Sequence, residues 1–150
     1  MAEDLTLVDS LVQSSFLVQG VMRRVAARHD LSVIQMRLLG ILRDREPGTL
    51  LLSRILELDK SSVTGLVDRA EKRGLVERVP DPDDGRAVRI KLTRGGRAVV
   101  TAGAAEVEVE IETVAAGLTD PQRRQLAGLL SRFASPPGRP AVPGTGRSPS

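Results

Sequence analysis

The stretch DKSSVTGLVDRAEKRGLVER, residues 59–78, contains the pattern that decides the fold. Its first part repeats apolar residues with the spacing of one helix face, which consists of Val63, Leu66, Val67 and Ala70. Asp59 or Lys60 opens the predicted helix, and Gly74 follows its last turn, where a left-handed residue commonly ends a helix. The helix therefore buries one face and exposes another, which is polar.

A shorter helix precedes this one. Residues 50–56 are expected to be helical with Thr49 as the capping residue, and a tight turn near residues 57–59 leads into the next helix. Two helices joined in this way form a helix-turn-helix, whose second helix enters the DNA major groove. Such a helix needs short polar side chains on its exposed face, because bulky groups would hold the backbone away from the base edges. Here that face offers Lys60, Ser61, Ser62, Thr64, Gly65, Asp68 and Arg69, and we expect these residues to contact DNA.

The segment after this helix predicts a β-hairpin with a long polar tip. Residues 75–80 alternate weakly, residues 88–92 alternate apolar with basic side chains, and Asp81-Pro82-Asp83-Asp84-Gly85 between them is typical of a turn. Arg86 at the tip is expected to enter a narrow minor groove, and Arg89 on the following strand is a further candidate DNA contact. Asp84 would support this wing by bonding either the Arg86 guanidinium or the amides of the tip.

The flanking segments are expected to be helical. Periodic apolar residues predict helices over 5–28 and, capped by Ser32, over 32–46, while Thr119-Asp120-Pro121 precedes a last helix near 121–133. Residues 97–118 are ambiguous, because Glu106 to Glu112 alternates like a strand. The absence of Pro and the richness in Ala and Glu favour a helix there. The fold class is therefore mainly α with a small β-hairpin.

Composition excludes several classes of protein. The chain has 150 residues, no Cys, one His and two Phe as its only aromatic residues. Thiolate metal sites, disulfides and multi-histidine centres are excluded, and no cofactor or metal is expected. No apolar run approaches a membrane span, and no basic segment precedes an apolar one at the N-terminus, so we expect a cytoplasmic protein. No set of side chains has the spacing of a catalytic site, so we expect no enzyme.

Charge is distributed unevenly along the chain. Of 22 basic residues 19 are Arg, and the net charge is only +3. Residues 60–97 alone hold 10 basic and 6 acidic residues, whereas the rest of the chain is close to neutral. This concentration of positive charge coincides with the predicted helix-turn-helix and hairpin. Outside it, we expect His29 to cap a helix end at the surface, and both Arg23, Arg24 and Arg28 and the acidic stripe 106–112 to face solvent.

The tandem of DKSSVTGLVDRAEKRGLVER (59–78) and DGRAVRIKLT (84–93) resembles the MarR family of winged helix-turn-helix transcriptional regulators. The resemblance lies in the Ser/Thr-rich helix, the exit Gly74-Leu75-Val76-Glu77-Arg78, the tip Asp84-Gly85-Arg86 and the pair Leu92-Thr93 before a long helix. It implies one domain over 1–134, with a DNA-binding region at about 32–93. It also implies dimerisation helices at about 5–28 and 94–134. The richness of residues 135–150 in Pro and Gly, with no large apolar residue beyond Val142, separately predicts a disordered tail.

The same resemblance implies a function. It points to a homodimer that binds double-stranded DNA at a pseudo-palindromic operator, as a repressor that releases DNA when a small phenolic or anionic effector binds. Two positions depart from the family pattern. Glu57 stands where many such turns carry Gly, and Leu50-Leu51-Leu52-Ser53 either exposes Leu51 or shifts the helix start. With the acids of the wing, Glu57 leaves open an alternative, a winged-helix interaction module that has lost DNA binding.

Overall fold

The computed structural model describes residues 4–135, so the expected tail beyond Ser135 lies outside the described residues. The fold is mainly helical with one two-stranded antiparallel sheet. In chain order, the elements are α1 (Leu7–Arg28), α2 (Val33–Leu42), α3 (Thr49–Leu56), α4 (Lys60–Lys72), β1 (Val76–Pro80), β2 (Val88–Leu92), α5 (Arg94–Val114), a short 3-10 helix (Ala115–Gly117) and α6 (Asp120–Ala134).

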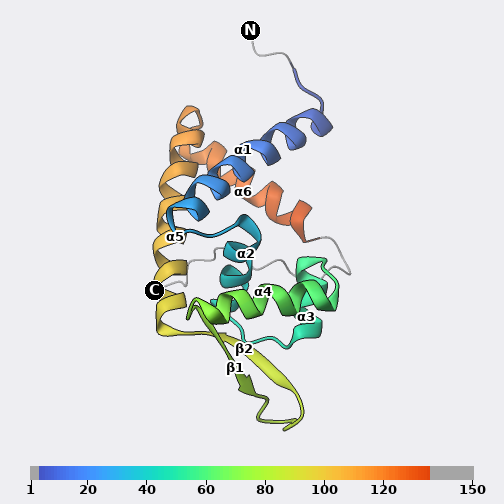
Figure 1. Cartoon of the computed structure of the whole chain (residues 1–150). Coiled ribbons are helices and arrows are strands. Elements are labelled where there is room, and N and C mark those ends of the chain that lie inside the picture. Colours follow the sequence, from blue (N-terminus) through green and yellow to red (C-terminus); the bar gives the residue numbers. More distant parts are fainter. Residues whose placement is uncertain (1–3, 136–150) are drawn as a thin grey trace.

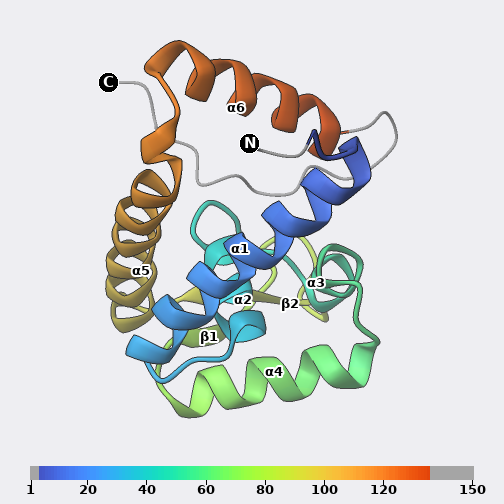
Figure 2. The same ribbon diagram turned by 90° about the horizontal axis from the view of Figure 1, so that it is seen from above.

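The elements are arranged in two groups (Figure 1). The hairpin of β1 and β2 projects from one end of the molecule, with α4 and α3 next to it, while α6 and the N-terminal half of α1 lie at the other end. Figure 2 shows that α1, α5 and α6 form a triangular outline when seen from above. The long helix α5 begins directly after β2 and runs from the hairpin end to the α6 end.

Local capping signals explain most helix boundaries. Ser32 and Gln35 form a reciprocal capping box at α2, and Thr119 and Gln122 form another at α6. Asp59 is the capping residue of α4, which selects one of the two expected positions. At the end of α4, Gly74 has φ of 70°, the left-handed conformation expected there.

Two predicted boundaries were wrong. Helix α2 ends at Leu42 rather than near Glu46, because the chain leaves the helix to run beside β2: the N–H of Ile90 donates to the carbonyl of Pro47, and Gly48 forms a β-bridge with Arg89. That bridge also places Gly48, not Thr49, at the N-cap of α3, without a side-chain cap. Helix α3 therefore begins one residue earlier than expected.

The hairpin and the fifth helix agree with expectation. β1 and β2 pair in antiparallel register from Val76 opposite Leu92 to Pro80 opposite Val88. Most of the ambiguous segment 97–118 is α-helical: α5 begins at Arg94, earlier than 97, and ends at Val114, where the 3-10 helix follows. The alternation of acids from 106 to 112 does not mark a strand.

The core is aliphatic and is built by the middle of the chain. Its largest fully buried side chains are Leu38, Leu39, Ile41, Leu42, Leu52, Leu66, Ile90, Val21, Val25, Val63, Val67 and Val76. At one point the backbone itself is closely packed: a Cβ added to Gly96 in the first turn of α5 would lie 1.9 Å from the carbonyl oxygen of Leu75. Only glycine permits this approach between α5 and the segment that enters β1.

Candidate nucleic-acid interface

The turn between α3 and α4 forms without glycine. Glu57 adopts the left-handed conformation, with φ of 55° and ψ of 42°. The N–H of Leu58 donates to the carbonyl of Ser53 at 3.1 Å, and the hydroxyl of Ser53 donates to the carbonyl of Leu58. These two bonds hold the turn, so the helix-turn-helix geometry is present despite Glu57. The run Leu50-Leu51-Leu52-Ser53 does expose Leu51, which is 40% exposed, and Leu50 is 69% exposed.

The first turn of α4 concentrates hydroxyl groups around one carboxylate. The hydroxyls of Ser61 and Ser62 donate to Asp59 at 2.6 and 2.9 Å, and the N–H of Ser62 donates to it at 2.8 Å. The hydrogen bond from the Ser61 hydroxyl, followed by those from Ser62, lowers the pKa of Asp59 to about 2. Thr64 donates its hydroxyl to the carbonyl of Lys60. All three hydroxyls are exposed, but each is already oriented by a local acceptor.

The middle of α4 presents Arg69 beside a glycine. A Cβ at Gly65 would lie 3.3 Å from Nη1 of Arg69, so the glycine lets the arginine lie across the helix surface. The two residues line an open hollow of about 430 Å³, together with Ile34, Leu58, Ser61, Ser62 and Leu66. Both the arginine and the serines of this hollow are accessible from outside the protein.

Asp68, the acid among the predicted contacts, is ion-paired with the wing. Its carboxylate lies 2.6 Å from Nη2 of Arg78 on β1, and the same guanidinium contacts Glu71 at 2.9 Å. Arg78 therefore contacts two acids of α4, offsets one of their two negative charges and fixes β1 against the helix. This pairing offsets part of the negative charge on the exposed face of α4.

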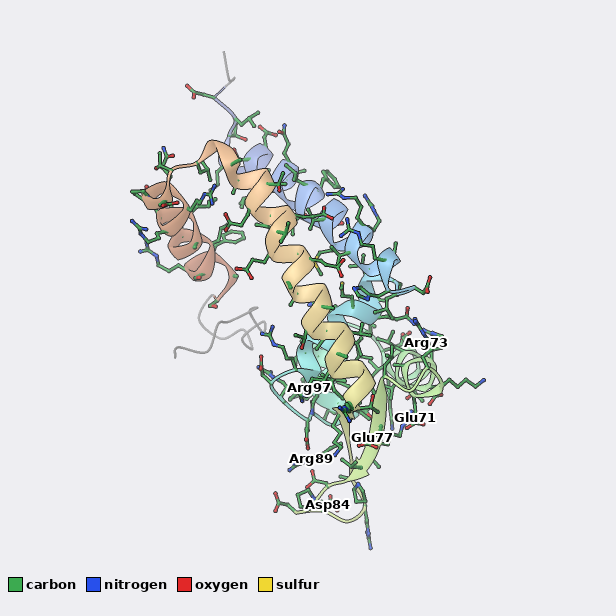
Figure 3. The ribbon with its side chains drawn as sticks, turned by 90° about the vertical axis from the view of Figure 1, so that its left-hand side faces the viewer. Glu71, Arg73, Glu77, Asp84, Arg89 and Arg97 are labelled. Carbon is green, nitrogen blue, oxygen red and sulfur yellow. The ribbon has the colours of Figure 1, made fainter. Side chains whose placement is uncertain are left out.

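Beyond Arg78 on β1, the wing carries an exposed arginine, Arg86, and a second ion-paired arginine, Arg89. Arg86 is exposed, and its backbone N–H donates to the carboxylate of Asp84 at 3.1 Å, which is one of the two bonding modes expected for Asp84. Arg89 is half-buried and donates to Asp81 at 3.0 Å. The N–H of Asp83 and then the guanidinium of Arg89 lower the pKa of Asp81. Figure 3 places Asp84 at the tip and Arg89 nearer the base of the hairpin.

A cluster of ion pairs between α1 and α5 was missed by the sequence analysis. Arg24 and Arg28 contact Glu110, each at 2.6 Å, and Arg28 and His29 contact Glu106 at 3.2 and 2.9 Å. The pKa of Glu110 is lowered by Arg24 and then Arg28, and that of Glu106 by Arg28 and then His29. The expectation that Arg24, Arg28 and the acidic stripe simply face solvent was therefore wrong, whereas His29 is the C-cap of α1, as expected. The spacing of four residues within each pair of like charges was the signal available.

No helix within residues 4–135 is both long and apolar enough to cross a membrane. Within the same residues, no group of three or more His, Asp or Glu side chains could hold a metal ion.

Comparison with known proteins gives one consistent result. A family model described as the MarR family matches residues 29–87. The homoprotocatechuate degradative operon repressor of Escherichia coli is 30% identical over 135 residues, which cover 89% of each chain. The transcriptional regulator PecS of Dickeya dadantii is 27% identical over 134 residues, covering 87% of this chain and 81% of PecS.

Solved structures extend the likeness to three dimensions. Wild-type MarR from E. coli in its apo form matches with a TM-score of 0.76 at 24% identity, covering 89% of this chain and 99% of that one. CouR from Rhodococcus jostii, solved with p-coumaroyl-CoA bound, matches with a TM-score of 0.74 at 26% identity, covering 87% and 93%. On these grounds, together with the helix-turn-helix and wing described above, the chain belongs to the MarR family of winged helix-turn-helix transcriptional regulators.

Proposed function

We propose that this DNA-binding transcriptional repressor acts as a homodimer on a pseudo-palindromic operator, with α4 in the major groove and the wing in the minor groove. The proposal is supported by the placement of α4 and the hairpin at one end of the fold (Figure 1). Arg69 on α4 and Arg86 on the hairpin are both exposed. Residues 32–93 form the DNA-binding region, and 5–28 with 94–134 form the dimerisation region. Because its target is DNA, we place the protein in the cytoplasm.

The contacts divide into two kinds. Arg69 reads a base by two parallel hydrogen bonds, and Gly65 lets the helix approach closely. Lys60 donates to a phosphate near the helix N-terminus, where the dipole favours an anion. Thr64, Ser61 and Ser62 reach phosphates when their hydroxyl protons turn away from the Lys60 carbonyl and from Asp59. Arg86 enters the minor groove, which needs the tip held by Asp84. Asp68 and Arg89 contribute through their ion pairs, by removing repulsion and stiffening the wing.

The braced wing also weighs against the alternative of an interaction module without DNA binding. That alternative rested on the acids of the wing and on Glu57. Asp81 is paired with Arg89, Asp84 bonds the amide of Arg86, and Glu57 completes the turn. These features therefore have roles that support a DNA-binding wing rather than oppose one.

Fluorescence anisotropy with labelled duplexes tests the two kinds of contact. Arg86→Ala should weaken binding to all sequences and reduce the salt dependence by about one unit of slope for each lost charge in each subunit. Arg69→Ala should cost about 1–3 kcal/mol at one base pair and relax discrimination there. Arg23→Ala on α1 is the charge-matched control and should change neither property. Unchanged affinity in both test variants would refute this binding surface.

Dimerisation is proposed from the exposed apolar surface of the far end. The residues exposed there are Leu7, Val8, Val12, Phe16, Leu17 and Val18 on α1 and Leu126, Leu129, Leu130 and Phe133 on α6. A surface this apolar favours a second copy of the chain. Sedimentation equilibrium should give about twice the chain mass, and Phe133→Ser should shift the equilibrium toward monomer. A monomeric wild type would refute both the dimer and the pseudo-palindrome.

A small phenolic or anionic effector is the remaining part of the proposal. CouR binds p-coumaroyl-CoA according to its structure, and the present chain shares its fold. We expect p-coumaric acid or a related phenolic acid to lower the affinity for a selected duplex. Benzoate, which lacks the phenol, serves as the control for the anion alone. If no phenolic or anionic compound changes the affinity, effector control by this class is refuted.

A further inference from the structure

One side chain attaches the end of the recognition helix to a helix outside the winged-helix region. Arg73 is the C-cap residue of α4. Its Nη2 donates to the carbonyl of His29 at 3.0 Å, and its Nη1 donates to the carbonyl of Asp30. These acceptors belong to the turn that ends α1, more than forty residues earlier in the chain. Figure 3 shows Arg73 at the edge of α4 next to the end of α1.

The turn is shaped to accept an arginine. Asp30 has φ of 55°, and the N–H of Asp30 and of Leu31 return to the carbonyls of Ala27 and Ala26, which closes α1. Two successive carbonyls at a helix C-terminus carry partial negative charge, which favours a cation. The planar guanidinium can donate to both at once, whereas an ammonium group reaches them as a single point charge.

The acceptor turn is itself fixed to α5. The ring of His29 contacts Glu106, and Arg28, its neighbour in sequence, contacts both Glu106 and Glu110. An unbroken series of polar contacts therefore runs from α5 through the last turn of α1 to Arg73. The other hydrogen bonds of α4, from Arg78 to Asp68 and at the Asp59 cap, lie within the winged helix. These bonds do not restrain the position of α4 relative to α1.

We propose that Arg73 is a positioning residue for DNA binding. By clamping the carbonyls of His29 and Asp30, it sets the tilt of α4 relative to α1 and α5, and thereby the separation of the two recognition helices in the dimer. The inference rests on the proposed homodimer. Two recognition helices must meet successive major grooves about 34 Å apart, so a tilt repeated in both subunits changes which operator spacing fits.

The first test measures spacing preference. A duplex selected by the wild-type chain from a randomised pool is compared with versions that carry one base pair inserted or removed at its centre. Arg73→Met keeps the aliphatic stem but has no donors, and should lower affinity for the selected duplex about tenfold while the preference among spacings largely disappears. Arg73→Lys should be intermediate. Lys72→Met, the adjacent charge-matched control, should keep the spacing preference.

The second test measures the helices without DNA. Because the chain has no Cys, Lys72→Cys introduces a single spin-label site per subunit. Pulsed dipolar spectroscopy should give a narrow distance distribution in the otherwise wild-type background and a broadened one when Arg73→Met is added. Circular dichroism establishes that each variant is folded, and Arg73→Lys provides a milder second variant. A role in stability alone would lower Tm without broadening the distribution.

The outcomes separate the two proposals. A wild-type chain without dipolar coupling removes the homodimer and, with it, this role of Arg73. In a second outcome, the wild-type chain dimerises and prefers one operator spacing, and folded Arg73→Met keeps the same distance distribution and the same preference. This outcome refutes the role of Arg73 and leaves the proposed function intact. If Arg73→Met loses the spacing preference and its distance distribution broadens, both the homodimer and the positioning role of Arg73 are supported.

Discussion

Replacing Gly96 by Ala should disrupt the junction between α5 and the strand entry. The new Cβ would lie 1.9 Å from the Leu75 carbonyl oxygen, whereas a carbon–oxygen contact needs roughly 3.3 Å. The two backbone segments must therefore separate by more than about 1 Å. Separation weakens the bond from the N–H of Thr93 to Leu75 and the bond from its hydroxyl to Gly74. Two hydrogen bonds at about 1 kcal/mol each, with overpacking of about 1–3 kcal/mol, outweigh the helix propensity gained, so we expect a net loss of about 2–4 kcal/mol.

Gly95→Ala is the matched control for this prediction. A Cβ there would lie 3.5 Å from the Gly74 carbonyl oxygen, which is an ordinary contact. The substitution should therefore be neutral or stabilise by up to about 1 kcal/mol, through helix propensity alone. Urea unfolding followed by far-ultraviolet circular dichroism at one protein concentration measures both variants. Equal stability of Gly96→Ala and the wild type, or an equal loss in both variants, would refute the close-approach argument.

Three further predictions concern strain and acid stability. Glu57→Gly should raise the free energy of unfolding by about 0.5–1 kcal/mol and Glu57→Ala should not, because only glycine relieves the left-handed conformation; a thermal melt that ranks the two variants equally contradicts this. The pKa of Glu110 is lowered on folding, so its contribution to stability is complete above the ordinary pKa of 4.5 and is lost as pH falls below that value. Glu110→Gln should therefore make Tm depend less on pH in the acid range. An unchanged dependence of Tm on pH would refute a stabilising role for the ion pairs between α1 and α5. The same sign applies to Asp59, with a pKa of about 2 against 3.8. Asp59→Asn should therefore lower Tm most at neutral pH, where the charged form contributes in full, and should reduce the pH dependence of Tm between these two values.

Features specified by neighbouring residues could be predicted from the sequence. Ser32 as a cap, Gly74 as a helix end and the hairpin after it each depend on residues a few positions away, and each was found where expected. The polar face of α4 was predictable for the same reason, since the buried set of one helix defines its exposed set. Whether those exposed residues bind DNA stays a prediction, with the assays above as its test.

Features that depend on distant partners were not found by interpreting each helix or strand alone. The end of α2 is set by pairing of residues 47–48 with β2, which no local pattern indicates. The charged groups of α1 and α5 looked solvated because each helix was interpreted alone, although Arg24 and Glu110 are 86 positions apart. Glu57 was hard to predict for another reason. A glutamate disfavours the left-handed conformation of a tight turn, but the packing of α3 against α4 requires that conformation at this position.

The placement of the core has a consequence for how the regulator responds to its own abundance. Buried apolar residues in the described part of the chain run from Val21 to Val100, and every described residue of α6 lies outside them. Because this core does not include α6, we expect a chain separated from the proposed dimer by dilution to keep its winged helix folded and to contact one half-site at a time. By mass action, occupancy of a full operator then rises more steeply than in proportion to the number of chains. The occupancy of the operator would thus depend on how fast the chain is synthesised as well as on any effector.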